Sequence, residues 1–349
     1  MRIAIVTTLA PFIKGGAEFL AANLAQACSA TGHQVDVFKL PFLDSSADSI
    51  QKSMDLCLQE DFSLWGQQAD LVICLKFPAY YVQHPCKIMW VLHQHRSAYE
   101  LWDHAAAQGH SHSAEDIALR EQIMALDKRV FNSALQNFTI SKTVSNRLKH
   151  YNHIESSPLY HPPALANAFA MDDTQAETAD YIFAPSRFEP LKRQHLLLEA
   201  LRLTKHPVKA VLCGSGSYEH HLRSFVVHYG LQDRVTLHTH LSVAEMISHY
   251  KNSLAVFFAP YDEDYGYVTL EAMLAEKAVI TCNDSGGTNE FVVHDHTGYI
   301  EPPEAEQIAA RLDALFMDRN LAVSIGQNAL HHYQSLSLSW DNVLNQLLY

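Results

Sequence analysis

Two glutamates eight positions apart bracket a glycine in the segment E-D-Y-G-Y-V-T-L-E, which covers residues 263–271. Glu263 follows the apolar run LAVFFAP, and Glu271 falls near the start of a helix that the pattern predicts from about residue 267. A helix N-terminus offers unpaired N–H groups and a partial positive charge, which suit a diphosphate. A carboxylate nearby can accept two hydrogen bonds from a ribose diol. The segment therefore predicts a nucleotide-diphosphate site, although a solvated acidic loop and a glutamate paired with the helix dipole would have the same spacing.

Glycines gather at the ends of predicted strands. Seven of the 13 glycines fall at four places that follow or adjoin such an end: Gly15 with Gly16, Gly214 with Gly216, Gly266, and Gly286 with Gly287. Open parallel sheets bind ligands at this edge, where a backbone without side chains can approach a phosphate. Glycines also make ordinary strand-to-helix turns, so one place alone is ambiguous. Four places in register favour ligand binding.

Two well-known phosphate-binding loops are excluded. A dinucleotide fold requires G-x-G-x-x-G directly after its first strand, with an acidic residue about 20 residues later. The Gly15-Gly16 pair comes well after the first predicted strand, and Gly214-Ser215-Gly216 has Glu219 where the third glycine would stand. The sequence also contains no G-x-x-x-x-G-K-[ST] motif. These absences argue against a nicotinamide enzyme and against a P-loop nucleotidase.

Short apolar runs alternate with helical patterns along the chain, which predicts an α/β protein with parallel sheets. Strands are expected at 2–6, 34–40, 71–77, 87–93, 181–186, 208–213, 235–240, 254–260 and 278–282. In the second half, helices are expected at about 193–204, 217–229, 243–251, 267–276 and 304–317, followed by a helix-like segment at 339–349. The pattern dissolves between residues 152 and 180, which predicts a domain junction there.

Composition limits the class of protein. The 349 residues are 48% hydrophobic and 18% charged, which is typical of a folded soluble chain long enough for two domains. A formal net charge of −13 without a basic face argues against nucleic-acid binding. The 22 histidines include the H-x-H pairs 93/95, 110/112, 238/240 and 294/296, which are dispersed and lack zinc-site spacing. We expect solvated or core histidines and no metal site.

The cysteines and apolar runs bear on the cellular compartment. The six cysteines stand singly at 28, 57, 74, 86, 213 and 282 and are expected to be buried reduced thiols, which favours the cytoplasm. The start MRIAIVTTLA fits a buried strand better than a signal peptide. No run approaches the about 18 apolar residues of a membrane span. A mildly basic helix at 141–151, with Ser141 as N-cap, leaves peripheral contact with the inner membrane face open, although an ordinary solvated face is the better interpretation.

Four motifs occur in an order that resembles a known family. They are G-G-A-E at 15–18, Arg187 with Lys192, E-x7-E with Y-G-Y-V-T-L-E-A-M, and S-G-G-T-N-E at 285–290. Together they are similar to those of the GT4 family of retaining glycosyltransferases, which have the GT-B fold. The resemblance implies two Rossmann-like domains facing across a cleft: an acceptor-side domain at 1–165 and a donor domain at 166–331. It also implies that a C-terminal helix at 332–349 packs back on the first domain.

The resemblance assigns roles to individual residues. It implies the catalytic residues Arg187, Lys192, Glu263 and His93, and the donor-binding residues Gly15, Gly16, Gly214, Gly266, Tyr267, Val268 and Glu271. Arg187 and Lys192 would hold the diphosphate, and Glu263 the sugar hydroxyls. The chain departs from the usual pattern at Ser186 and at Arg193, where the family usually has glycine, and at Tyr261, where it usually has serine. These departures bear on loop geometry and donor preference.

The function that the resemblance implies is transfer of a sugar from a nucleotide-diphosphate sugar to a hydroxyl acceptor, in cell-envelope or polysaccharide synthesis. The acceptor could be a glycan, a lipid-linked molecule or a small molecule. No catalytic metal or other cofactor is expected, because lysine and arginine supply positive charge. Two alternatives stay open. One is a nucleotide-sugar epimerase of the same fold, and the other is a non-catalytic protein that binds nucleotide sugars.

Overall fold

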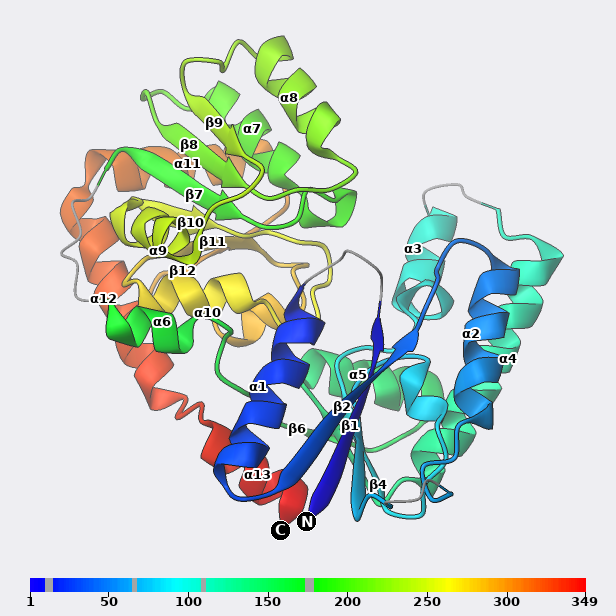
Figure 1. Cartoon of the computed structure of the whole chain (residues 1–349). Helices are drawn as coiled ribbons and strands as arrows, with labels where there is room; N and C mark the ends of the chain where they lie inside the picture. The colour runs from blue at the N-terminus through cyan, green and yellow to red at the C-terminus, as the bar shows by residue number, and fades with distance from the viewer. Residues whose placement is uncertain (10–14, 65–67, 108–110, 173–178) are drawn as a thin grey trace. The chain divides into compact units, whose positions relative to one another are not determined.

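The protein consists of two compact units, each built on one six-stranded parallel sheet flanked by helices (Figure 1). The computed structural model describes residues 1–9, 15–64, 68–107, 111–172 and 179–349. The first unit comprises Met1–His161 together with Ser339–Tyr349, and the second comprises Pro162–Leu338. Helix α12 (Arg319–Ser335) belongs to the second unit, so the chain returns to the first unit at Ser339.

The first unit orders its strands β2-β1-β3-β4-β5-β6. The strands are β1 (Arg2–Leu9), β2 (Gln34–Pro41), β3 (Leu71–Cys74), β4 (Lys87–Val91), β5 (Gln136–Thr139) and β6 (Ser157–Pro158). The helices are α1 (Gly16–Ala30), α2 (Ala47–Gln59), α3 (Glu100–Ala107), α4 (Ala114–Ser133), α5 (Lys142–Asn152) and α13 (Trp340–Leu348), with short 3-10 turns η1 (Ala79–Tyr81) and η2 (Arg96–Ala98). Helix α13 packs against α1, and the Trp340 ring lies 6.3 Å from that of Trp90 on β4. The predicted return of the C-terminal helix to the first domain is confirmed.

The second unit orders its strands β12-β11-β10-β7-β8-β9. The strands are β7 (Tyr181–Pro185), β8 (Lys209–Cys213), β9 (Val235–His238), β10 (Ala255–Phe257), β11 (Val279–Cys282) and β12 (Gly298–Glu301). Besides α12, the helices are α6 (Ala166–Met171), α7 (Gln194–Leu203), α8 (Glu219–His228), α9 (Val243–Asn252), α10 (Tyr267–Leu274) and α11 (Ala305–Met317), with the 3-10 turns η3 (Pro190–Lys192) and η4 (Gly287–Glu290). From β7 the chain adds β8 and β9 on one side of the sheet and then β10, β11 and β12 on the other, so the strand order reverses between the paired strands β7 and β10.

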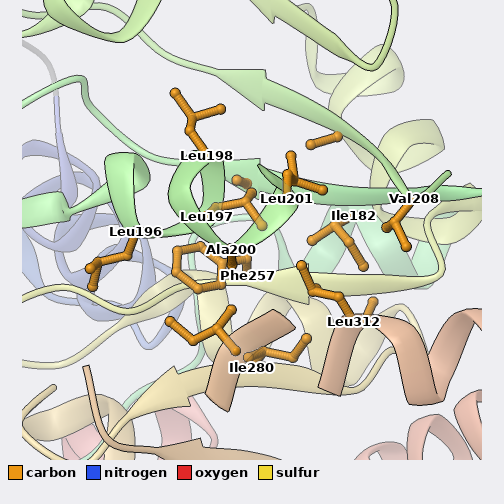
Figure 2. Packing of buried hydrophobic residues seen from close by; sticks show 14 of the residues in the cluster. Ile182, Leu196, Leu197, Leu198, Ala200, Leu201, Val208, Phe257, Ile280 and Leu312 are labelled. Carbon is orange, nitrogen blue, oxygen red and sulfur yellow. The ribbon is translucent and has the colours of Figure 1, made fainter. Parts of the chain in front are cut away.

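The core of the second unit forms where α7 and α11 pack on the sheet (Figure 2). Helix α7 buries Leu197 and Leu201 against strand residues such as Ile182 and Phe257, and α11 contributes Leu312. All five of these side chains are at most 2% exposed. Burial of such a side chain stabilises the fold by roughly 1.5–3 kcal/mol. This core fixes the sheet whose carboxyl edge carries the candidate site.

Most expected elements are present, with differences at the ends. The runs 71–77 and 254–260 form shorter strands, because pairing ends at Cys74 and at Phe257. Strands β5, β6 and β12, which are two to four residues long, were not predicted. Among the described residues, no helix combines the length and the apolar character needed to cross a membrane.

Two side-chain predictions in the first unit were wrong. Cys86 is exposed, because it stands in the turn before β4 instead of in a strand. Arg147 does not lie on a solvated helix face. Its side chain is 10% exposed and pairs with Glu100 at 3.3 Å, so helix α5 is less basic toward solvent than the sequence predicts. Ser141 is the N-cap of α5 as expected, and its hydroxyl accepts the Val144 N–H.

A buried carboxylate connects the helices of the first unit. Asp127 on α4 is 0% exposed, and it accepts hydrogen bonds from Tyr81 at 2.7 Å, Tyr99 at 2.7 Å, Tyr80 at 3.0 Å and the Gln94 amide at 2.9 Å. Burial raises the pKa of Asp127 to about 6, while the donated hydrogen bonds oppose that rise. The network holds α4, the η1 turn and the segment after β4 together.

We predict that Asp127→Ala destabilises the first unit by about 3 kcal/mol, because three hydroxyls and one amide lose their acceptor in the interior. All four tryptophans of the sequence fall within the ranges of this unit, so urea unfolding followed by tryptophan fluorescence reports it selectively. Asp116→Ala, which removes an exposed capping carboxylate from the same helix, is the control and should cost about 1 kcal/mol or less. Equal losses in the two variants would contradict the prediction.

Candidate functional site

The carboxyl edge of the second sheet brings separate motifs together. Open parallel sheets bind ligands where the strand order reverses, outside the carboxyl ends of the strands. In this unit the reversal lies between β7 and β10. The loop after β7 carries Arg187 and Lys192, and the loop after β10 carries Glu263 and Gly266. Residues about 75 positions apart in the sequence thus meet at the place where this topology favours a ligand.

The centre of the site is an ion pair between Lys192 and Glu263. Lys192 Nζ lies 2.5 Å from Glu263 Oε2, and the two side chains are 16% and 19% exposed. Lys192 ends the η3 turn, and its ammonium also lies 5.8 Å from the centre of the Phe258 ring. The pair is shielded enough for a strong charge interaction, yet it remains in contact with solvent. It can therefore exchange its partners for those of an anionic or hydroxylated ligand.

Glycines set the backbone around Glu263. Gly287 N–H donates to the Glu263 carbonyl at 2.7 Å, and Gly286 pairs with Glu263 across an isolated bridge. A β-carbon at Gly286 would lie 2.5 Å from the Glu263 carbonyl oxygen, which is closer than real side chains come. The S-G-G segment after β11 is thus glycine-rich because its backbone packs directly on the loop that carries Glu263.

The other predicted glycines also serve close packing. A β-carbon at Gly214 would lie 1.9 Å from the Ser186 carbonyl oxygen, so a glycine after β8 lets the loop with Arg187 approach. Gly266 has φ +89°, the left-handed region, and is the N-cap of α10. A β-carbon there would lie 2.7 Å from Thr288 Oγ1. The helix N-terminus with the amides of Tyr267 and Val268 therefore stands at the same edge as the ion pair.

Glu271 is placed differently from the other predicted residues. It is the fifth residue of α10, beyond the first turn, and is 8% exposed. Its Oε2 accepts a hydrogen bond of 2.8 Å from the buried Tyr250 hydroxyl, and the Leu165 N–H also donates to it. Burial raises the pKa of Glu271 to about 7, against the effect of these two hydrogen bonds. No motif predicted Tyr250, because only the packing of α9 beside this helix brings it to Glu271.

The remaining predicted residues are distributed over both units. Arg187 is exposed, and its side chain makes no ion pair or hydrogen bond with the described part of the chain. His93 belongs to the first unit, where it follows β4, is half-buried, and has Nδ1 2.6 Å from the Gln94 carbonyl oxygen. Gly15 caps α1, and Gly16 is the first residue of that helix. They form the start of α1, which follows β1, and the first sheet reverses its strand order between β1 and β3.

The histidine pairs do not combine into a cluster within the described ranges. No group of three or more histidine, cysteine, aspartate or glutamate side chains there is arranged to hold a metal ion. His110, one member of a predicted pair, lies outside the described residues.

One family model matches nearly half of the chain. Residues 169–332 match the family described as Glycosyl transferases group 1. The chain is 28% identical over 203 residues to alpha-1,3/1,6-mannosyltransferase ALG2 of Homo sapiens, covering 51% of this chain and 48% of that protein. It is 31% identical over 105 residues to the capsular polysaccharide biosynthesis glycosyltransferase CapM of Staphylococcus aureus, covering 29% and 27%. The chain thus spans about half or less of the length of these curated relatives.

Solved structures are similar over the whole chain. Sucrose-phosphate synthase from Thermosynechococcus elongatus has a TM-score of 0.76 at 18% identity, covering 99% of this chain and 97% of that one. The Anabaena protein HepE in complex with UDP-glucose has a TM-score of 0.70 at 16% identity, covering 99% and 98%. At these identities the likeness concerns the fold. It confirms the predicted GT-B class with two Rossmann-like units.

We predict that Gly266→Ala destabilises the second unit by about 2–3 kcal/mol more than Gly230→Ala, because the new methyl group meets Thr288 as well as a left-handed backbone. Gly230 has φ +65° with nothing within 4 Å of an added β-carbon, so its substitution carries the backbone cost alone. Urea unfolding followed by far-UV circular dichroism measures both variants, while tryptophan fluorescence follows the first unit separately. Equal destabilisation in the two variants would show that the close approach at Gly266 is inconsequential.

Proposed function

We propose that this chain, whose residues 169–332 match the family described as Glycosyl transferases group 1, transfers a sugar from a nucleotide-diphosphate sugar to a hydroxyl acceptor, with retention of anomeric configuration. The observation that carries the proposal is the Lys192–Glu263 ion pair at the strand-order reversal, beside the N-terminus of α10. This arrangement offers cations and backbone N–H groups for a diphosphate, together with a carboxylate for sugar hydroxyls.

The donor would exchange contacts with the ion pair. The diphosphate takes the Lys192 ammonium and the exposed Arg187 guanidinium, and the amides of Tyr267 and Val268 donate to it. Glu263, released from Lys192, accepts hydrogen bonds from the sugar. Glu271 accepts hydrogen bonds from the ribose. The family pattern adds Gly214 in this unit and Gly15, Gly16 and His93 of the first unit, and these assignments are part of the proposal.

The reaction needs charge stabilisation more than acid catalysis. As the bond between the anomeric carbon and the diphosphate oxygen breaks, negative charge grows on the departing phosphate. Lys192 and Arg187 stabilise that charge in the transition state. The acceptor oxygen bonds to the anomeric carbon on the face that the diphosphate leaves, and the departing phosphate oxygen takes the acceptor proton. The configuration is then retained, and the two cations fill the role that a metal ion would otherwise have.

The relatives indicate which substrates to test first. HepE of Anabaena has been solved with UDP and with UDP-glucose, and CapM is named for capsular polysaccharide biosynthesis. We therefore propose a UDP-sugar as the first donor to test. For the acceptor we propose a polysaccharide or lipid-linked precursor of the cell envelope, reached from the cytoplasm at the inner face of the membrane.

We predict that one of the UDP-, GDP-, ADP- and dTDP-sugars binds in isothermal titration calorimetry, and that Lys192→Ala and Glu271→Ala each weaken its binding at least about tenfold. The reason is that each variant removes a charge-assisted hydrogen bond to the donor. Lys251→Ala is the matched control. Lys251 is 17% exposed and paired with Asp172 at 3.1 Å in the same unit, so its loss should leave donor affinity unchanged. Unaltered affinity in Lys192→Ala would contradict the assignment of the site.

Product analysis separates the alternatives. Transfer with retention gives a glycosidic product whose anomeric configuration, read by proton NMR, equals that of the donor. An epimerase would convert the donor without any acceptor. A non-catalytic protein would bind the donor tightly and release it unchanged.

We predict that donor affinity rises as pH increases from about 6 to 8. The reason is that the pKa of Glu271 is about 7 and only its carboxylate accepts both ribose hydrogen bonds. The Glu271→Gln variant should bind weakly with no such dependence. Tyr250→Phe removes a hydrogen bond that lowers the pKa of Glu271, so its midpoint should shift to higher pH. Calorimetry across this pH range measures all three proteins, and a flat profile for the native chain would refute the role of Glu271.

A further inference from the structure

Arg193, the residue after Lys192, makes an extensive set of side-chain contacts. Its Nη1 and Nη2 donate to the two carboxylate oxygens of Asp284 at 2.8 and 2.6 Å. Its Nε donates to the Ala259 carbonyl at 2.8 Å, and Nη2 donates to the Pro260 carbonyl at 3.0 Å. The side chain is 12% exposed. The planar guanidinium thus donates four hydrogen bonds to three residues of the protein, so few of its N–H groups remain to bind a ligand.

The partners of Arg193 are the segments that carry the site. Ala259 and Pro260 follow β10 and lead to Glu263, and Asp284 follows β11. The Asp284 carbonyl also accepts the Asp262 N–H at 2.9 Å, directly before Glu263. A single side chain from the loop after β7 therefore connects that loop to the ends of two neighbouring strands.

Lys192 is held on both sides. On its N-terminal side, the Leu191 carbonyl accepts the Tyr261 N–H at 2.7 Å. On its C-terminal side, Arg193 binds the carbonyls of Ala259 and Pro260. Lys192 stands between these two attachments to the Glu263 loop, so the distance between its ammonium and Glu263 depends on both.

The backbone at Arg193 adds a reason for the contacts. Arg193 has φ +51° and ψ +34°, the left-handed region that favours glycine. A residue with a β-carbon is disfavoured in that region. The GT4 pattern usually has glycine after the lysine. In this chain an arginine adopts the unfavourable left-handed conformation there, and its guanidinium makes four hydrogen bonds.

We propose that Arg193 and Asp284 form a clamp that positions Lys192 against Glu263, and that this clamp controls the rate of sugar transfer and not the affinity for the donor. The inference rests on the proposed function. Stabilising the charge of a departing phosphate requires the cation to stand within a fraction of an ångström of its best position, whereas binding tolerates small displacements. Arg193 acts through Lys192 and is therefore a positioning residue.

The test compares Arg193→Gly, Asp284→Asn, the double variant and Arg193→Lys. Glycine suits the left-handed backbone, so Arg193→Gly removes the clamp without adding strain. We expect turnover to fall about 10–100-fold in each single variant, with the donor dissociation constant within about threefold of the native value. The double variant should be no slower than either single one, because both remove the same interaction. Arg193→Lys should not restore turnover, since an ammonium cannot bind a carboxylate in bidentate fashion.

The control is Arg319→Ala. Arg319 pairs with Asp180 before the first residue of β7, at the opposite edge of the same sheet, so its loss should leave turnover unchanged. If Arg193 were a donor ligand, Arg193→Gly would weaken donor binding about tenfold and Asp284→Asn would not. That result, or native turnover in Arg193→Gly, overturns the clamp.

A second readout does not depend on sugar transfer. Lys192 is ion-paired and only 16% exposed, so it should acylate slowly with an amine-reactive ester, as quantified by mass spectrometry of its peptide. Loss of the clamp should raise that rate roughly fivefold in Arg193→Gly, because a loosened ion pair exposes the amine. If the native chain binds no nucleotide sugar but this rise is seen, the proposed function fails and the clamp stands. An unchanged rate means that Arg193 does not position Lys192.

Discussion

The reversal of strand order between β7 and β10 is the constraint on which the candidate site depends. Helices that follow the strands on either side of such a point diverge, and the loops at the carboxyl ends are left facing one another. Here those loops carry a lysine and a glutamate that form an ion pair of 2.5 Å. A different strand order with the same elements would separate the loop that carries Lys192 from the loop that carries Glu263, and the ion pair would not form.

Charge within this edge is compensated in two ways. The Lys192–Glu263 pair is partly open to solvent and can change partners, whereas the Arg193–Asp284 pair is bidentate and is reinforced by backbone carbonyls. The first arrangement suits a group that meets substrate, and the second suits a group that holds a loop. The surroundings of these two adjacent cations therefore satisfy their charge to different degrees.

The glycines at this edge show how residues chosen as phosphate-binding candidates can serve close packing. Their spacing predicted a phosphate site, and the structure shows that Gly214, Gly286 and Gly287 are required where neighbouring loops touch. These are the same loops that bring Arg187 and Glu263 to the sheet edge. At this edge the glycines act by allowing neighbouring loops to approach each other.

The sequence by itself determined the two α/β units, the helix that returns to the first of them, and the residues that gather at the carboxyl edge. Hydrophobic period and turn residues are local signals, and they suffice for these features. Tertiary structure alone decided the partners: Lys192 with Glu263, Glu271 with Tyr250, Arg193 with Asp284, and Arg147 with Glu100. The two residues of each pair are 21 to 91 positions apart in the sequence. Such pairing follows from strand order and helix packing, which no local pattern encodes. The same packing raised the pKa of Glu271, because burial is a property of the fold and not of the residue.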